Sequence, residues 1–491
     1  MSRRRASVSL WVSLLLAAVL PGAAGCSVNP ATGESSFTGL MSESDEVRIG
    51  RESHPQVLAQ FGGAYQDPEL DRYIDSLGQL LAHASDRPNL QYHFTVLDSP
   101  IVNAFATPGG YVYITRGLLA LANNEAEVAG VLAHEIGHVA ARHAAERQSQ
   151  AVLASIPGIL TGVVTGSGAL SEAVNSGAAA HLQSYSRDQE YQADLLGVRY
   201  LSRTNYDPLG MASFLGQLEA NDRLDAEIMG RPEMADQFSI MSTHPRTADR
   251  IQRAIQEAGG THVSTPLTER DLYLAKVDGL RYGDEPEQGF IRDRQFLHPV
   301  LRFAFTVPAG FHMMNSSEAV IAQRADGAAL LASSTQKFTS AQMIDYLTAE
   351  WAPRLQMTDA ETIDVNGRDA ATGSGQLELK SGVRDVRLVA IRFDANTIFR
   401  FLFLTKPEQT AGLARELQQT TYSFRRLSAA EAARLHPQTI RVVTVRGGDT
   451  VAKLAAKMPF PDFREERFRV LNGLGAADRL TPGRRVKLIV E

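Results

Sequence analysis

Two histidines and a glutamate stand at a spacing that can hold and use a metal ion: His134, Glu135 and His138 form the pattern His-Glu-x-x-His. The surrounding residues 118–146 have the apolar period of a helix. Because four residues make just over one helical turn, both histidines lie on one face and can reach a single zinc ion at about 2.0–2.1 Å. Glu135 is adjacent to that face, where it can act as a base on a water molecule at the metal. The pattern predicts a catalytic zinc site, against the alternative of histidines that merely pack in a core.

A catalytic zinc site takes a third protein ligand and leaves one position for water. Glu190 and Asp194 are the candidates, because they share one face of a helix that is predicted to begin near Ser186. Glu190 can coordinate the ion while Asp194 holds a ligand histidine through its other ring nitrogen. The alternative is that both are surface carboxylates, as most helical glutamates and aspartates are. His143, five residues after His138, is predicted to point away from the ligand face as a structural residue or as a partner of a ligand.

The elements around these residues follow from the apolar pattern. Helices are predicted over residues 70–81, 118–140 and 193–201. Residues 94–97 and 111–115 alternate as strands do, with a turn at Pro108-Gly109-Gly110 between them. The strand at 111–115 is the candidate sheet edge for an extended substrate, unless it is an interior strand. Residues 150–171 carry no charge and predict a packed or mobile helical hairpin rather than a second membrane span.

The first 26 residues have the order of an export signal. Arginines near the start precede an apolar run of 13 residues, which is short for a membrane span of about 20 residues. The single cysteine, Cys26, permits no internal disulfide. Ala24-Gly25-Cys26 resembles a bacterial lipoprotein cleavage site, which implies removal of residues 1–25 and lipidation of Cys26. Ser27 then favours attachment to the outer membrane, and secretion with a free Cys26 is the alternative.

Length and composition indicate a multidomain globular protein. A chain of 491 residues predicts about three domains, and its net charge of −6 argues against a nucleic-acid partner. Residues 26–262 are mainly helical, and the polar stretch 263–290, interrupted by glycine and proline, predicts a linker. Residues 291–427 have the pattern of an α+β domain of unknown role that resembles PsbP-like modules.

The final unit, residues 436–491, has the predicted order strand, helix, helix, strand. Its landmarks are Gly448-Asp449-Thr450, residues 471–474 and Pro482-Gly483. They resemble a LysM domain, and the resemblance implies binding of N-acetylglucosamine-containing glycans such as peptidoglycan. A structural, non-binding copy of that fold is the alternative, because residues 458–466 are atypical.

The first half of the chain resembles one family of zinc metallopeptidases. The matching segments are residues 29–33, 103–106, 108–110, 134–138, 190–194 and 243–246. They are similar to the CAAX prenyl endoproteases, HtpX and BepA, and most similar to BepA-like exported members. The resemblance implies a mainly helical zincin-type domain with a small edge sheet and one Zn²⁺ per chain. Its ligands would be His134, His138 and Glu190, with Asp194 as the supporting acid.

The same resemblance implies that His244, on a Thr-His-Pro loop, approaches the metal. There it could block the water position, assist the transition state or be purely structural. The expected function is an exported endopeptidase that hydrolyses unfolded or misassembled envelope proteins through a metal-activated water. A peptidoglycan cross-link endopeptidase and a chaperone or scaffold with a latched site are the alternatives. The expected location is the periplasm, with a lipid anchor on Cys26.

Overall fold

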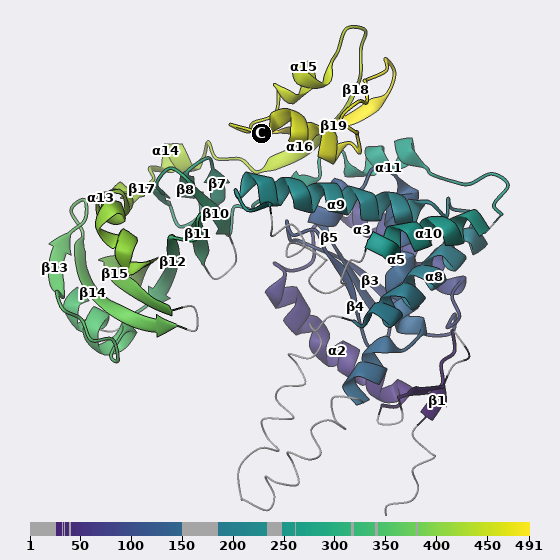
Figure 1. Cartoon of the computed structure of the whole chain (residues 1–491), viewed down its shortest axis with the longest axis horizontal. Coiled ribbons are helices and arrows are strands. Elements are labelled where there is room, and N and C mark those ends of the chain that lie inside the picture. The colour runs from purple at the N-terminus through teal and green to yellow at the C-terminus, as the bar shows by residue number, and fades with distance from the viewer. Residues whose placement is uncertain are drawn as a thin grey trace, which may run out of the picture. The chain divides into compact units, whose positions relative to one another are not determined.

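The computed structural model describes ten ranges of the chain: 26–31, 33, 35–38, 41–149, 185–232, 248–260, 262–315, 319–338, 342–379 and 382–491. They fall into two compact units, the first within residues 1–220 and 236–276 and the second within 221–235 and 277–491 (Figure 1). The first unit is mainly helical and the second is rich in strands, which confirms a multidomain protein with a helical N-terminal part. No helix in the described part combines the length and apolar character that a membrane crossing requires.

The helices of the first unit agree with the apolar pattern. They are α2 (Glu43–Gln60), α3 (Pro68–His83), α4 (Arg116–Leu121), α5 (Glu125–Ala140), α8 (Arg187–Arg203), the first part of α9 (Gly210–Ile228), α10 (Ala248–Gly260) and most of α11 (Arg270–Val277). The helix predicted over 118–140 is divided, because Asn124 ends the preceding turn and caps α5 by accepting a hydrogen bond from the Glu127 N–H at 2.9 Å. Every residue of α5 is buried, including its three glutamates and the two histidines of the metal-binding pattern.

Helices α5 and α8 pack closely against each other because glycines stand at their contact (Figure 1). A Cβ atom on Gly137 would lie 3.1 Å from the carbonyl oxygen of Ala193, and one on Gly197 would lie 3.3 Å from the backbone nitrogen of His134. Larger side chains at either position would therefore push the two helices apart. This close contact places Glu190 and Asp194 of α8 opposite the histidines of α5.

A small sheet beside α5 has the strand order β3-β5-β4. Strands β3 (His93–Leu97) and β5 (Tyr111–Thr115) confirm the two predicted strands and pair in parallel, while β4 (Ala104–Thr107) pairs antiparallel with β5. The prediction that residues 111–115 form the sheet edge is wrong, because β5 has a partner on both sides. The edge strands are β3 and β4, and the short sequence of β4, Ala-Phe-Ala-Thr, gives little strand signal.

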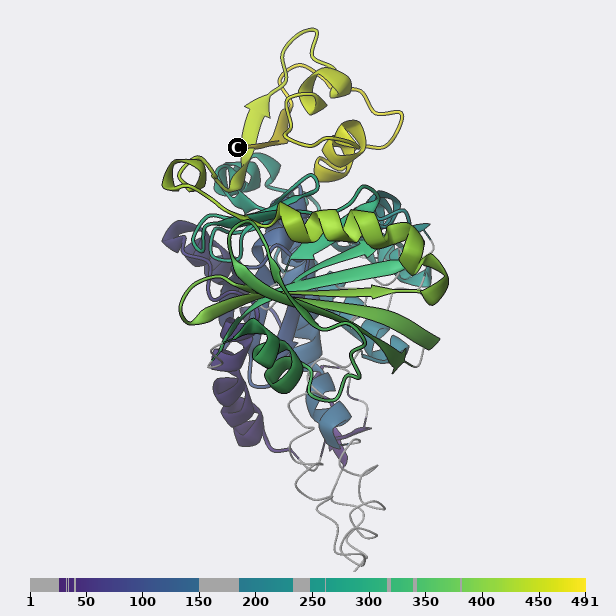
Figure 2. The ribbon, with the colours of Figure 1, turned by 90° about the vertical axis from the view of Figure 1, so that its left-hand side faces the viewer.

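The second unit is built on a seven-stranded antiparallel sheet. Its order is β10 (Phe311–Asn315), β11 (Val320–Arg324), β12 (Ala329–Lys337), β16 (Thr397–Thr405), β15 (Gly382–Arg392), β14 (Asp369–Leu379) and β13 (Glu361–Asp364). Helix α13 (Pro407–Ser423) lies across one face of this sheet (Figure 2). The opposite face is covered by α12 (Met343–Asp345) and the π-helical turn η4 (Tyr346–Trp351). Asn366 and Gly367, with φ angles of 53° and 78°, form the hairpin turn between β13 and β14.

Other strands and helices of this unit complete its core and its C-terminal end. A four-stranded sheet has the order β17 (Arg425–Arg426), β9 (Phe303–Thr306), β8 (Gln295–His298) and β7 (Phe290–Arg292). After α14 (Ala429–Ala432) the chain follows the predicted order of strand, helix, helix and strand. These elements are β18 (Gln438–Thr444), α15 (Val451–Ala455), α16 (Arg464–Leu471) and β19 (Arg485–Val490).

Residues 263–290 contain regular elements where the sequence predicts a linker. The buried side chain of Tyr273 in α11 donates a hydrogen bond to the carbonyl oxygen of Leu119 in the first unit. Strand β6 (Arg281–Tyr282) pairs with β18 in the second unit. The stretch is therefore divided between the two units. At the other end of the chain, β1 (Cys26–Val28) pairs with β2 (Ser35–Phe37).

Candidate metal centre

Helices α5 and α8 bring three metal-binding side chains together. The Nε2 atoms of His134 and His138 lie 3.0 Å apart. The carboxylate of Glu190 lies 3.6 Å from Nε2 of His134 and 3.5 Å from Nε2 of His138. A tetrahedral zinc ion with bonds of about 2.05 Å separates its ligand atoms by about 3.3 Å. The three donors therefore fit such an ion, and all three side chains are buried.

The proton on each histidine can be placed from its second contact. Nδ1 of His134 lies 2.9 Å from Oδ1 of Asp194, so Nδ1 carries the proton and Nε2 keeps its lone pair for a metal. The Asp194 contact is the one predicted from the one-turn spacing of the two acids on α8. Burial lowers the pKa of His138 well below 6.5, so this ring is neutral, as a zinc ligand must be.

His138 is oriented by His143, which the sequence analysis gave as a structural residue or a partner of a ligand, and through it by Gln192, which the sequence analysis did not assign. Its Nδ1 lies 2.8 Å from Nδ1 of His143, and Nε2 of His143 lies 2.6 Å from the side-chain oxygen of Gln192. The side chain of Asn29 donates to the same oxygen at 3.4 Å, which marks that atom as the acceptor. His143 therefore donates from Nε2 and accepts at Nδ1, so His138 donates from Nδ1 and presents Nε2 to the metal.

The expectation that His143 points away from the ligand face is wrong. It assumed that α5 continues, which would place residue 143 about 140° around the helix from residue 138. Instead, α5 ends at Ala140 and Arg142 has a left-handed φ of 59°, so the chain turns back toward His138. Burial lowers the pKa of His143 to about 4, which keeps its ring neutral.

A buried arginine balances the two carboxylates of α8. Arg250 on α10 donates from Nε and Nη2 to the two oxygens of Asp194, each at 2.7 Å, and its Nη1 lies 2.8 Å from Glu190. Burial by itself raises the pKa of Asp194, but the charge and hydrogen bonds of Arg250 outweigh it, so the pKa is lowered. With two acids and one arginine, the cluster keeps a negative charge that suits a divalent cation.

Arg250 was missed by the sequence reading, although two signals pointed to it. Two acids one turn apart on a buried helix require a nearby cation. In addition, Arg250, Ala254 and Ala258 recur every four residues on α10, and all three are buried. An arginine at the spacing of the buried face of a helix is therefore the sequence signal that could have identified Arg250.

Edge strand β4 lies beside the metal-binding face. Ala106 and Thr107 of β4 share with His138 and Tyr185 the lining of a small cavity of about 10 Å³. The ring of Tyr185 stacks on the ring of His138, with centroids 3.9 Å apart. The edge of the small sheet is thus next to a metal-binding residue.

Of the other residues predicted from the sequence, the structure describes Glu135 and Cys26. Glu135 is fully buried in the same turn of α5 as His134. His244, the export signal at 1–25 and the uncharged stretch 150–171 lie outside the described residues. Cys26 begins β1.

Known proteins were compared with the chain. Residues 68–258 match the model of peptidase family M48. The chain is 30% identical over 286 residues to the beta-barrel assembly-enhancing protease of Escherichia coli (strain K12), covering 54% of this chain and 55% of that protein. It is 28% identical over 214 residues to the mitochondrial metalloendopeptidase OMA1 of Schizosaccharomyces pombe, covering 42% of this chain and 59% of that protein. The chain therefore spans about half the length of the curated relatives it matches.

Among solved structures, cyanobacterial PsbP from Synechocystis sp. PCC 6803 matches with a TM-score of 0.23 and 12% identity, covering 28% of this chain and 94% of that chain. The family match encloses His134, His138, Glu190 and Asp194, together with Arg250. Residues 68–258, which contain the candidate metal centre, are therefore similar to peptidase family M48.

Proposed function

We propose that this protein is a zinc-dependent endopeptidase that hydrolyses peptide bonds with its M48 domain. The observation that carries the proposal is the fit of His134, His138 and Glu190 to a tetrahedral ion. Each ligand histidine contacts a second side chain through Nδ1, which leaves its Nε2 for the metal. Both named relatives are proteases, which supports the same reaction class.

The residues take distinct roles in this proposal. His134, His138 and Glu190 hold the ion, which supplies Lewis-acid catalysis when bound. Glu135 accepts a proton from the attacking water and passes it to the leaving amine. Asp194 orients His134. His244 remains a predicted catalytic residue, either as a group that assists the reaction or as a latch, with a purely structural role as the alternative.

An extended polypeptide is the substrate class that this site suits. Within the described residues, strand β4 has a sheet neighbour on one side only, so its other side can pair with a substrate main chain. Main-chain pairing selects extended chains over folded ones and imposes little sequence preference. We therefore propose unfolded or misassembled envelope proteins as substrates, in keeping with the name of the Escherichia coli relative.

The proposed location is the periplasm, at the outer membrane. It is supported by the export pattern of residues 1–25 and by Cys26, the proposed site of lipidation. Residues 436–491 are proposed to bind peptidoglycan, because their order of strand, helix, helix and strand is the order of a LysM domain.

The first test is proteolysis of an unfolded protein such as casein by the zinc-loaded full chain. Glu135→Gln should lower the rate by about 10²–10⁴-fold, because the general base is lost, while zinc stays bound. Glu52→Gln, at an exposed position of α2, is the matched control and should cut at the parental rate. A Glu135→Gln protein that cuts as fast as the parent would contradict the proposal.

Two further arms separate the alternatives. His244→Ala should raise the rate if His244 is a latch and lower it if His244 assists the reaction. Purified peptidoglycan replaces casein in the other arm, where release of cross-linking peptides without casein cleavage would favour the cross-link endopeptidase. A zinc-loaded His244→Ala protein that cuts neither substrate would favour a chaperone or scaffold.

A further inference from the structure

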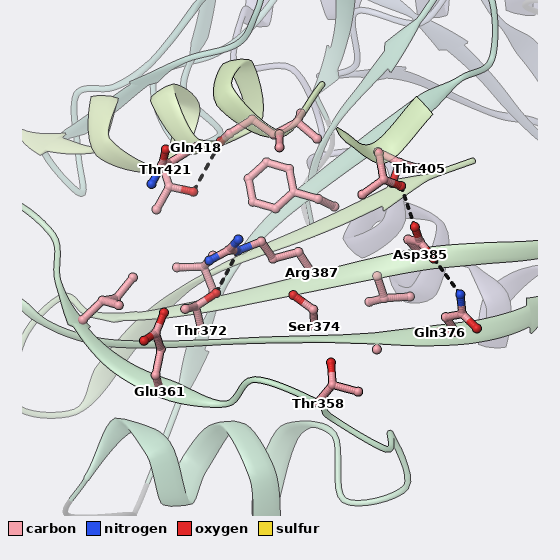
Figure 3. Close-up of a pocket in the computed structure, with 18 of the residues that line it drawn as sticks. Thr358, Glu361, Thr372, Ser374, Gln376, Asp385, Arg387, Thr405, Gln418 and Thr421 are labelled. Atoms are coloured by element: carbon pink, nitrogen blue, oxygen red, sulfur yellow. Dashed lines mark hydrogen bonds between the residues drawn. The ribbon is translucent and has the colours of Figure 1, made fainter. Parts of the chain in front are cut away.

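A cavity of about 580 Å³ opens in the β-rich unit, outside the residues that match the peptidase family. It lies between α13 and the face of strands β13, β14 and β15 (Figure 3). One side of α13 forms its wall, where Thr410, Ala414, Leu417, Gln418 and Thr421 recur at helical spacing. Its volume is within the range of small-molecule sites, about 300–1,000 Å³.

The floor of the cavity carries one oriented cation. Arg387 on β15 donates from Nε to the hydroxyl oxygen of Thr372 on β14 at 3.0 Å. Thr372 is itself 1% exposed, and its hydroxyl donates to the carbonyl oxygen of Leu388 at 3.0 Å. The guanidinium is therefore fixed at one nitrogen, as Figure 3 shows. Across all the described ranges, its two Nη groups make no hydrogen bond or ion pair.

The nearby carboxylates do not neutralise this arginine. Asp385, two residues before Arg387 on β15, accepts from the Thr410 hydroxyl at 2.6 Å and from the Gln376 amide at 2.9 Å, so both of its oxygens are occupied (Figure 3). Glu361 is exposed on β13, directly across from Thr372, and makes no ion pair with Arg387. Arg387 thus presents its free donors to the cavity between two acids that do not bind it.

We propose that this cavity binds a singly charged carboxylate attached to an apolar body. The two Nη groups of Arg387 match the two oxygens of a carboxylate. A doubly charged phosphate monoester would meet repulsion from Asp385 and Glu361. Phe403 stands directly opposite Arg387 on β16, and Tyr422, which also lines the cavity, is 42% exposed, so apolar surface adjoins the cation. The same chemistry occurs in a free carboxylic acid and at the C-terminus of a polypeptide.

Calorimetric titration of the full chain tests the proposal, with Glu135→Gln present in every sample so that peptide probes stay intact. N-acetyl-L-phenylalanine should bind saturably, whereas its neutral amide and phenyl phosphate should bind at least about tenfold more weakly. Arg387→Gln should weaken N-acetyl-L-phenylalanine by about 10- to 100-fold, because charge-assisted hydrogen bonds are lost. Equal binding of the acid and the amide, or tighter binding of phenyl phosphate, would overturn the proposal.

Two more variants control for charge and for space. Arg384→Gln removes a positive charge from the same strand but lies outside the cavity lining, so binding should be unchanged. Ala414→Trp, at an exposed position of α13, fills the cavity mouth and should abolish binding while Arg387 stays in place. If neither Arg387→Gln nor Ala414→Trp weakens binding, the assigned site is wrong.

A peptide arm then identifies the source of the carboxylate. An acetylated Ala-Ala-Ala-Phe peptide with a free C-terminus is compared with N-acetyl-L-phenylalanine. Tighter binding of the peptide assigns the site to polypeptide C-termini, and equal or weaker binding assigns it to free acids. Both results require that amidation of the probe removes binding, and binding of the amidated peptide would overturn the proposal.

Discussion

Each histidine of the metal centre is held by a partner that accepts its Nδ1 proton. For His134 that partner is Asp194, which one-turn spacing on a helix allows to be predicted. For His138 it is His143, which is placed by the left-handed residue Arg142 after α5. Sequence spacing predicts partners within a helix, but it cannot predict where the chain returns after the helix ends. Arg250 was missed for the same reason, because it comes from a separate helix.

His143 should therefore control zinc affinity without binding the ion. His143→Ala removes the acceptor for His138 Nδ1–H, and we expect zinc to bind about 10- to 100-fold more weakly. His143→Gln, whose amide oxygen can accept the same proton, should recover part of the loss. Competition with a fluorescent chelator measures the affinity, with His83→Ala, at an exposed site, as the control. Parental affinity in His143→Ala would show that the ring contact does not orient His138.

Arg250 should stabilise the fold by compensating two buried acids. Arg250→Met leaves Asp194 and Glu190 without their cation, and we expect the free energy of unfolding of the metal-free protein to fall by about 3–5 kcal/mol. Arg253→Met is the matched control on the exposed side of α10, where Arg253 lies 3.9 Å above the ring of Tyr191. Arg253→Met loses only this cation–π contact, so we expect its free energy of unfolding to fall by about 0.5–1 kcal/mol. Chemical denaturation measures both, and equal losses would contradict the assigned role.

At the scale of elements, periodicity predicted the long helices and the strongly apolar strands. Helix α3 and strands β3 and β5 follow their patterns closely. Strand β4 was missed because four residues give too short a pattern, and it is defined by pairing with β5. Tertiary pairing, rather than local preference, therefore determines the element that borders the site.

Strand β14 shows why a glycine-containing strand escapes prediction. A Cβ atom on Gly375 would lie 2.7 Å from the backbone oxygen of Gln356, so the strand needs glycine to approach that segment. The low strand preference of glycine hides β14 in the sequence. The close approach at Gly375 can be tested by a stability measurement that does not involve the metal.

Two glycine substitutions should have opposite effects on the β-rich unit. Gly375→Ala should lower the free energy of unfolding by about 1–3 kcal/mol, because the new methyl group meets backbone. Gly412→Ala, in α13 where a Cβ atom would meet nothing within 4 Å, should raise it by about 0.5–1 kcal/mol. Thermal and urea unfolding measure the pair, and a stabilising Gly375→Ala would refute the close packing of β14.

At the scale of the whole molecule, the first unit holds the candidate metal site and the second unit holds two features without an assigned role. In the described ranges, a single group of three residues, His134, His138 and Glu190, can gather around one metal ion. The M48 match ends at residue 258, before the first strand of the β-rich unit. The role of this unit can be sought at its proposed carboxylate-binding cavity and at its C-terminal strand-helix-helix-strand segment.

We predict one zinc ion per chain, held within the segment that matches the M48 family. A crystal of the zinc-loaded protein, measured at the zinc absorption edge, tests this most directly. One anomalous peak should lie about 2.0–2.2 Å from Nε2 of His134, Nε2 of His138 and a carboxylate oxygen of Glu190. A zinc-loaded crystal with no peak between these three side chains, or with zinc bound by other residues alone, would contradict it.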